Sequence, residues 1–405
     1  MASSKSVETN DDLISSMPAI VTDKILKHLP LAIAAKTSIL SRTWRRNWLS
    51  CPYLVFDVAF WDGFSKLDDS VNWHKGSNIM SSVLFHHNGR VDSFYLDLRP
   101  ADLQIDKNVS LSQWLSLLSR NCPRKITLIS WAGEWSSLVI MPSYIFHCKE
   151  LMKLKLQCFV LYAPPLDFKG FSHLKRLELL YMKFNNGIDM LWSLIAKCPC
   201  LVFLRLENCL GMNILDIDHA PSLEKLIIKG PFDSLRLKKV PRLIDVSLSS
   251  TKSKMSDTKT AVATINSLAS SYKLKCLAIE GGINKSLPVA FNHLDKLCLT
   301  DLTLTDTDVF CFSLGMLQSC PFIKDLEISH NRNSEEADLC SLCRLPQPPM
   351  LFRTSITGSN AELKLIEYLL AISVVLENLF FKCEKLDAAS ELKGIALENL
   401  SNSID

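Results

Sequence analysis

The hydrophobic positions of this chain follow one phrase, Leu-x-x-Leu-x-Leu, which recurs throughout the sequence after residue 150. With conservative replacements, the phrases begin at Leu151, Leu174, Leu201, Leu223, Leu243, Leu274, Leu294, Ile323 and Leu376. The last apolar positions of each phrase alternate with other residues, which predicts a short strand with one face turned into a core. Residues 91–98 and 126–128 carry weaker versions of the pattern and predict two earlier turns of the same structure.

Segments between the phrases have helical spacing and would cover the other side of the strands. Residues 111–118 and 190–196 are examples, with apolar side chains three and four positions apart. Most phrases start roughly 20 to 30 residues after the previous one, which is the period of leucine-rich repeats. Cys209 lies where such repeats place Asn or Cys to satisfy turning backbone. Because one unit cannot bury its leucines alone, we predict an α/β fold in which the units stack into a curved leucine-rich-repeat solenoid.

An α/β sheet enzyme is the alternative interpretation of these strands. It would need a glycine-rich phosphate loop or a nucleophile elbow, and the sequence contains neither motif. We therefore expect no catalytic residues and no cofactor.

Residues 13–56 follow a different pattern, with three helix-sized blocks bounded by prolines and carrying apolar residues four positions apart. The boundaries are Pro18, Pro30 and Pro52, and the apolar stripes contain Val21, Ile25 and Leu29, then Trp44 and Trp48. A unit this small buries little surface by itself. We therefore expect it to pack against a partner.

This segment resembles an F-box, the helical module that docks its carrier onto a Skp-type adaptor in a cullin-RING ubiquitin ligase. The matching positions include Met17-Pro18, Ile25-Leu26, Leu29-Pro30, Leu40-Ser41-Arg42, Trp44-Arg45 and Trp48. The resemblance implies adaptor contacts at Leu13, Met17, Pro18, Ile25, Leu26, Leu29, Pro30, Leu40, Trp44 and Trp48. Ala19-Ile20 replaces the acidic pair common in the family, and since acids favour a helix N-terminus, adaptor affinity is expected to be somewhat reduced. An ordinary helical cap on a larger domain is the alternative.

The rest of the chain is similar to the plant F-box family that carries leucine-rich repeats and often a C-terminal FBD segment. The similarity lies in residues 47–57, 113–120, 141–148 and 168–171, and residues 361–377 are similar to the FBD core. Residues 345–350 interrupt the expected strand, and residues 392–405 lack the usual family ending. The predicted organisation is a disordered N-terminus at 1–12, an F-box at 13–56, a linker with degenerate first repeats at 57–150, a solenoid at 151–340, and an FBD-like repeat and cap at 341–405.

Composition narrows the class of partner and the compartment. The net charge is +3, from 45 basic and 42 acidic residues, so nothing points to a nucleic acid or a membrane surface. Residues 1–12 lack the apolar core of a secretory signal, and the apolar run 369–376 is too short to span a bilayer. We expect a soluble intracellular protein of the nucleus, the cytoplasm or both.

The fourteen cysteines are expected to be reduced and mostly buried. Cys340 and Cys343 have zinc-ligand spacing, and Cys198 and Cys200 form another close pair. A structural zinc site needs a second suitably spaced pair, and none is evident. We therefore predict no metal.

Charged residues beside the inward leucines are candidates for contact with a target. In a repeat strand they project from the concave face. Basic residues predominate early, and the candidate substrate contacts are Lys153, Arg176, Arg205, Lys225 and Arg236. Asp245, Glu280, Asp325 and Glu327 follow in the later strands. The alternatives are an ordinary solvated face, a polarised groove for a charged segment of a protein, and a pocket for an inositol polyphosphate or a small hormone.

Together these features predict a non-catalytic substrate-recognition subunit of a Skp-cullin-F-box ubiquitin ligase. The F-box would bind the Skp-type adaptor, and through it the cullin and the RING subunit, while the repeats would bind an unknown protein substrate. Catalysis would come from the E2 bound to the RING subunit. The alternatives are an interaction scaffold without ubiquitin transfer and a small-molecule receptor that uses the concave face of the repeats.

Overall fold

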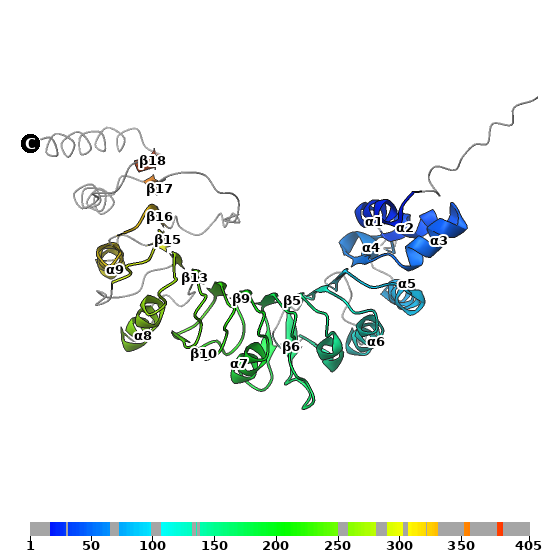
Figure 1. Cartoon of the computed structure of the whole chain (residues 1–405), viewed down its shortest axis with the longest axis horizontal. Coiled ribbons are helices and arrows are strands. Elements are labelled where there is room, and N and C mark those ends of the chain that lie inside the picture. The colour runs from blue at the N-terminus through cyan, green and yellow to red at the C-terminus, as the bar shows by residue number, and fades with distance from the viewer. Residues whose placement is uncertain are drawn as a thin grey trace, which may run out of the picture. The chain divides into compact units, whose positions relative to one another are not determined.

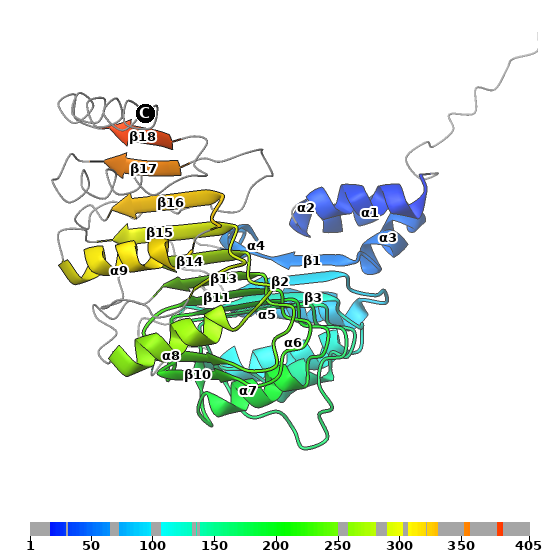
Figure 2. The ribbon, with the colours of Figure 1, turned by 60° about the vertical axis from the view of Figure 1, so that its left-hand side comes forward.

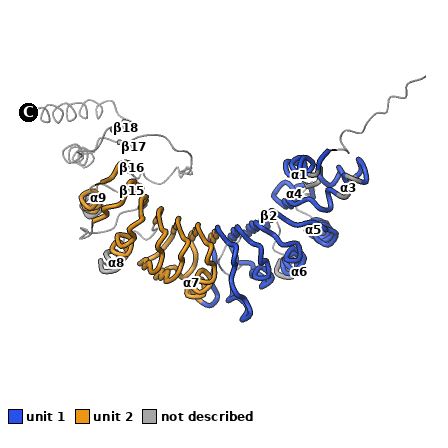
Figure 3. The backbone as a smooth tube through the Cα atoms, viewed as in Figure 1, with its two compact units in different colours: residues 1–176, 181–186 blue, residues 177–180, 187–405 orange. Residues whose placement is uncertain are grey.

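The structure is a computed structural model that falls into two compact units (Figure 3). Unit 1 comprises residues 1–176 and 181–186, and unit 2 comprises residues 177–180 and 187–405. The residues it describes are 17–29, 31–64, 73–98, 107–131, 135, 138–249, 258–280, 290–302, 307–320, 322–330, 352–356 and 379–383. Each unit is described by itself below.

Unit 1 begins with a helical segment whose boundaries follow from its prolines and its caps. The segment contains α1 (Ala19–His28), α2 (Leu31–Lys36), the 3-10 helix η1 (Thr37–Ile39) and α3 (Arg42–Leu49). Pro18 precedes α1 with φ −57°, which suits the start of a helix. Leu29 leaves α1 in an extended conformation, ψ 139°, as a following proline requires. The Ser41 hydroxyl accepts a hydrogen bond from the Trp44 amide at 3.3 Å and caps α3.

The helices α1, α2 and α3 of this segment share a small core. Leu26, Ala34, Trp44 and Cys51 are buried together, and Leu29, Trp48 and Tyr53 pack against them partly buried. Of the predicted apolar stripes, Leu29, Trp44 and Trp48 therefore pack in or against this core, whereas Val21 and Ile25 are exposed.

The remaining strands of unit 1 belong to two parallel sheets, and helices connect successive strands in the sequence (Figures 1 and 2). The main strands are β1 (Tyr53–Phe56), β2 (Ser93–Asp97), β3 (Lys125–Ile129) and β5 (Lys153–Gln157), parallel and in register in that order. A second parallel sheet contains β4 (Val139–Ile140), β6 (Phe159–Leu161) and β8 (Lys183–Phe184). The helices are α4 (Val58–Asp62), α5 (Trp73–His86), α6 (Lys107–Ser119) and the 3-10 helix η3 (Ser143–His147). Its fold therefore continues from the helical segment into a parallel sheet.

Unit 2, described by itself, has the same kind of arrangement. Its main strands are β7 (Arg176–Leu180, of which Arg176 belongs to unit 1), β9 (Phe203–Glu207), β11 (Lys225–Lys229), β13 (Asp245–Ser249), β14 (Cys276–Glu280), β15 (Lys296–Leu302), β16 (Asp325–His330), β17 (Phe352–Ile356) and β18 (Leu379–Cys383). They are hydrogen-bonded in chain order. The helices are α7 (Asp189–Ala196), α8 (Thr258–Ala269) and α9 (Thr307–Gln318), and β10 (Ile214–Ile217) pairs with β12 (Ser234–Leu237) in a separate two-stranded sheet. Unit 2 is thus also a parallel α/β structure.

The phrase Leu-x-x-Leu-x-Leu places one row of apolar residues across the main strands of unit 2. Residues at equivalent positions pair in register and are almost fully buried: Leu204, Leu226, Val246, Leu277, Leu297 and Leu326. Each such burial contributes about 1.5–3 kcal/mol. Because the paired residues lie on adjacent strands, the stability of the sheet depends on the stacking of neighbouring repeats.

The predicted α/β class is confirmed: the phrases coincide with strands of a parallel sheet, and residues 111–118 and 190–196 fall within α6 and α7. Among the main strands, β1 and β17 were not predicted, and neither were β4, β6, β8 and β10 of the smaller sheets. Among the described residues, no helix has both the length and the apolar character needed to cross a bilayer.

Candidate functional site

The helical segment of unit 1 exposes six aliphatic side chains outside its core. We call this set the helical apolar surface, and it consists of Ile20, Val21, Ile25, Ile33, Ile39 and Leu40. Ile39 is 80% exposed, Ile20 72% and Leu40 59%. Aliphatic side chains gathered on a segment this small are costly to leave in water, and such patches mark sites of protein association. This surface is the candidate adaptor site.

The structure divides the residues predicted to contact an adaptor into three groups. Pro18, Ile25 and Leu40 are exposed, and Met17, Leu29 and Trp48 are half-buried. Leu26 and Trp44 lie in the core of the segment at 2% and 3% exposure, so their predicted position on the binding surface is wrong. Leu13 and Pro30 lie outside the described residues.

Sequence reasoning missed four members of the helical apolar surface: Ile20, Val21, Ile33 and Ile39. Ile20 was treated as a departure from the family pattern, although a large aliphatic residue at the start of a helix was itself a signal. Val21 belonged to an apolar stripe expected to pack against a partner, but it was not named among the adaptor contacts. Ile33 and Ile39 belong to the short elements α2 and η1, which are too short for periodicity to assign a face.

Polar contacts hold α1 against α3 and the following strand. The Asn47 side-chain amide donates to the Thr22 hydroxyl at 3.3 Å, and the Lys27 ammonium lies 4.9 Å from the centre of the Tyr53 ring. Partial burial, and then the charge of Asp92, raise the pKa of the Asp23 carboxyl. The helical segment is therefore packed against residues of the first repeat.

The helical segment also joins the sheet of unit 1 without an intervening linker. Only residues 50–52 separate α3 from β1, which pairs with β2 along its whole length. The Asn88 amide donates to the Leu49 carbonyl at 3.0 Å, and the amides of Asp92 and Ser93 donate to the Pro52 carbonyl at 2.8 Å and 3.0 Å. The strand and these bonds fix the helical segment to the start of the sheet.

The predicted substrate contacts do not form one cluster. Lys153 is exposed on β5 and Arg176 is half-buried on β7, both in unit 1. Arg205 and Lys225 are half-buried on the neighbouring strands β9 and β11 of unit 2. Arg236 is exposed on β12, in the two-stranded sheet with β10, so its predicted place on the face of the main sheet is wrong. The misassignment arose because Ser234–Leu237 alternates polar and apolar residues as the main strands do.

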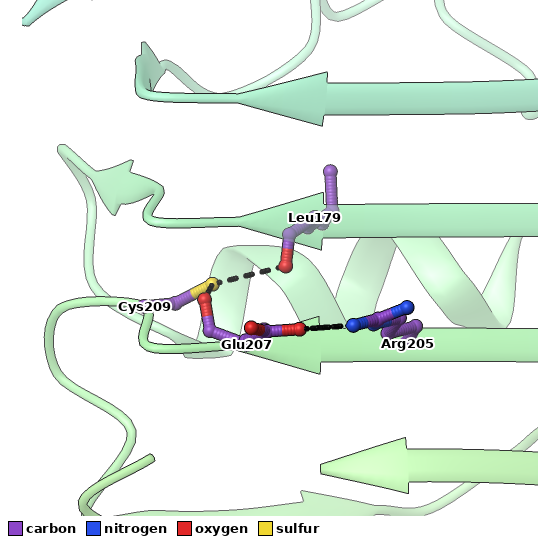
Figure 4. Close-up of polar contacts among 4 residues, drawn as sticks. All are labelled: Leu179, Arg205, Glu207 and Cys209. Carbon is purple, nitrogen blue, oxygen red and sulfur yellow. Dashed lines mark hydrogen bonds and ion pairs between the residues drawn. The ribbon is translucent and has the colours of Figure 1, made fainter. Parts of the chain in front are cut away.

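Basic residues on the main sheet of unit 2 are paired with carboxylates. Arg205 forms an ion pair with Glu207 of the same strand, with Nε donating at 3.0 Å (Figure 4). The Lys225 ammonium binds Asp245 of the next strand. Lys296 lies 2.9 Å from Asp325 and 3.8 Å from Glu327. Burial lowers the pKa of Lys296, but the hydrogen bond to Asp325 and the neighbouring charges outweigh burial, so the pKa is raised. These pairs favour the interpretation of a solvated, locally neutralised face over a polarised groove.

Buried thiols in the described residues have structural positions. The Cys209 thiol donates to the Leu179 carbonyl at 3.4 Å (Figure 4), the role in backbone satisfaction predicted for it. Burial raises the pKa of Cys148, Cys276 and Cys320 to about 12, so these thiols are protonated at neutral pH. Cys198 is buried and Cys200 exposed, while Cys340 and Cys343 lie outside the described residues. The part of the chain that the structure describes contains no group of three or more potential metal ligands.

Parallel strands stacked in register, with their leucines inside, define the class as a leucine-rich-repeat protein. The model of a family described as the LRR repeats of the FBD-associated F-box protein At5g56370 matches residues 111–277. The chain is 30% identical over 410 residues to the F-box/FBD/LRR-repeat protein At1g13570 of Arabidopsis thaliana, across 94% of this chain and 95% of that protein.

Two other relatives from Arabidopsis thaliana show the same affiliation. The putative F-box/FBD/LRR-repeat protein At5g22670 is 25% identical over 96% of this chain and 95% of its own length. F-box/LRR-repeat protein 13 is 30% identical over 49% of this chain and 41% of its own length. The chain therefore belongs to the plant F-box/FBD/LRR-repeat family, as its motifs predicted.

Proposed function

We propose that this protein is the substrate-recognition subunit of a Skp-cullin-F-box ubiquitin ligase. In this proposal residues 13–56 form a three-helix F-box that binds a Skp-type adaptor, and the repeats form a curved solenoid that binds the protein to be ubiquitinated. The chain contributes no catalytic group and acts by holding its target near the E2 enzyme.

The observation that supports this proposal best is the helical apolar surface. Its six aliphatic residues belong to the segment that resembles an F-box, and they are exposed and not part of the core formed by Leu26, Ala34, Trp44 and Cys51. A docked adaptor would bury them, and full burial of each side chain is worth about 1.5–3 kcal/mol. The surface therefore fits a permanent protein partner.

Binding to the adaptor is tested by co-expression of the full chain with a plant Skp-type adaptor and by titration of the purified proteins. We expect a stable complex. Ile39→Asp combined with Leu40→Asp should weaken it by about 2 kcal/mol or more, roughly thirtyfold in Kd, because charged residues would enter a desolvated interface. Both side chains are exposed, so the thermal stability of the free chain should stay nearly unchanged.

Leu166→Asp is the matched control, since Leu166 is fully exposed elsewhere in unit 1. It makes the same chemical change outside the helical segment and should leave the Kd for the adaptor unchanged. Equal binding by the Ile39/Leu40 variant and the parent chain would refute the F-box assignment.

Ubiquitin transfer separates a ligase subunit from a scaffold that only binds the adaptor. The full complex with cullin, RING subunit, E2 and ubiquitin should modify a protein that co-purifies with the chain. Transfer should disappear with the Ile39/Leu40 variant and remain with Leu166→Asp. Adaptor binding without transfer to any co-purifying protein would favour the scaffold.

A further inference from the structure

A groove of about 580 Å³ opens in unit 2 at the ends from which strands β13, β14, β15 and β16 begin. These strands run side by side in Figure 2. The groove is lined by residues of the turns that lead into them, including Ile244, Tyr272, Asp295 and Phe322. We call it the strand-entry groove. Its size is that of sites which hold a small ligand or the side chains of a bound peptide.

Backbone hydrogen bonds tie the turns of the strand-entry groove to one another. The Lys275 amide donates to the Ile244 carbonyl at 2.9 Å, the Asp295 amide to the Lys275 carbonyl at 2.8 Å, and the Lys324 amide to the Asp295 carbonyl at 2.9 Å. The walls are therefore preformed, which lowers the entropy lost when a partner binds.

Aromatic side chains stand exposed in this preformed groove. Tyr272 is 59% exposed and Phe322 62%, and Ile244 is also exposed beside the buried Leu294. Large apolar side chains, tyrosine especially, supply much of the binding free energy where proteins associate. The groove can thus seat an apolar side chain of a partner.

Lysines surround these apolar residues and outnumber the carboxylates. Lys273, Lys275 and Lys324 line the groove, and Asp295 is the single acidic residue among its lining residues. Asp295 is shared, with the Lys324 ammonium at 3.0 Å and the Lys275 ammonium at 3.8 Å, and Lys273 lies over the Tyr272 ring at 5.7 Å. These exposed pairs are weak and can exchange for a ligand, so the groove has an excess of positive charge for an anionic partner.

We propose that the strand-entry groove docks an acidic segment of a target protein, with an aromatic or large aliphatic side chain of that segment packed against Tyr272 and Phe322. The proposal deepens the function proposed above, because the segment would belong to the protein that is ubiquitinated. A compact phosphate ligand fits less well, since two of the three lysines converge on Asp295 instead of on an empty site.

The test selects peptides from a random twelve-residue phage library with the full chain and no adaptor. We expect enriched peptides in which a Phe, Trp, Tyr or Leu is flanked by Asp and Glu. The consensus peptide is then labelled, and its Kd is measured by fluorescence polarisation. Binding should weaken as NaCl is raised from 0.05 to 0.5 M, because screening reduces the attraction between the lysines and the acidic flanks.

Variants assign that binding to the strand-entry groove. Phe322→Ala, and separately Lys273→Glu with Lys324→Glu, should each raise the Kd about tenfold or more. Tyr272→Ala repeats the aromatic test in a different turn, and circular dichroism reports whether each variant is folded. Lys153→Glu, an exposed lysine on the sheet of unit 1, is the matched charge control and should leave the Kd unchanged.

The proposal is overturned if no acidic consensus emerges, if the groove variants bind as the parent chain does, or if Lys153→Glu abolishes binding. Tighter binding of a twenty-nucleotide single-stranded DNA or of inositol hexakisphosphate at the same lysines would also overturn it, by naming another ligand. Adaptor binding is measured on the same preparations. A chain that binds the peptide but no adaptor would refute the proposed ligase function and support the groove. A chain that binds the adaptor but no peptide would refute the groove and leave the proposed ligase function unaffected.

Discussion

Trp44 and Ile39 belong to the same helical segment and lie in opposite surroundings. Trp44 is 3% exposed and packs with Leu26, Ala34 and Cys51, whereas Ile39 is 80% exposed. A tryptophan in a short module suggests an interface anchor, and a plain isoleucine suggests a core. Here the larger ring fills the core, because a segment with so few residues needs one bulky side chain to exclude water from it.

Trp44→Ala should therefore destabilise the fold of the helical segment, and not merely remove a side chain from its binding surface. We expect a loss of about 3–5 kcal/mol, the usual cost of removing a buried tryptophan, with faster hydrogen exchange across α1, α2 and α3. Ile39→Ala should change stability by no more than about 0.5 kcal/mol, as is usual for exposed positions. Hydrogen exchange of the full chain, read peptide by peptide, measures both. Unchanged exchange in Trp44→Ala would mean that the ring is not part of the core.

At the scale of elements, four turns that follow main strands share an unusual backbone conformation. Cys158, Tyr181, Asn208 and Gly230 directly follow β5, β7, β9 and β11, and all have positive φ. At Gly230 φ is +124°, and an added Cβ would lie 2.8 Å from the Asn208 side-chain oxygen and 3.0 Å from its backbone nitrogen. Glycine is required there both by conformation and by the close approach of the preceding turn.

Gly230→Ala should accordingly cost more stability than Gly211→Ala. Gly211 also has positive φ, +82°, but nothing lies within 4 Å of an added Cβ, so it isolates the conformational cost of about 1–2 kcal/mol. The contact with Asn208 should raise the cost for Gly230 by at least another 1 kcal/mol, a typical penalty of overpacking. Chemical denaturation of the two variants gives the difference. Equal costs would show that the Asn208 turn moves aside freely.

The elements that could be predicted from the sequence are those whose periodicity is strong. Each leucine phrase occupies a strand because alternation assigns both the strand and its inward face. Strand β1 was missed because its residues lie inside the block that resembles an F-box. Arg236 was misplaced because the two-stranded sheet uses the same alternation as the main one, so the pattern identifies a strand without saying which sheet it joins. The strand-entry groove depends on turns without any periodicity, and only their spatial neighbours reveal it.

At the scale of the whole molecule, unit 1 carries its helical segment on the first strand of its sheet. Besides the pairing of β1 with β2, Gly89 approaches the end of α3 so closely that an added Cβ would lie 2.6 Å from the Ser50 carbonyl oxygen. The candidate adaptor site and the sheet of unit 1 are therefore parts of one packed body.

Gly89→Ala should disturb this junction and both of the parts that meet there. We expect about 1–3 kcal/mol of destabilisation from overpacking against backbone, with faster hydrogen exchange in α3 and β1 together and weaker adaptor binding. Gly63→Ala is the control, since φ is −59° at Gly63 and an added Cβ would lie 3.3 Å from the nearest atom. The Gly63 variant should keep adaptor affinity. If exchange rises in α3 alone, the two parts are not coupled.

The short connection between α3 and β1 also limits how binding specificity can change among proteins with this fold. Where a flexible linker joins two modules, a change in linker length alters their relative orientation without changing the structure of either module. Here a single inserted residue would put β1 out of register with β2 and turn its inward side chains outward. New specificity must therefore come from substitutions on exposed faces and turns, while the segment that joins helices to sheet keeps its length.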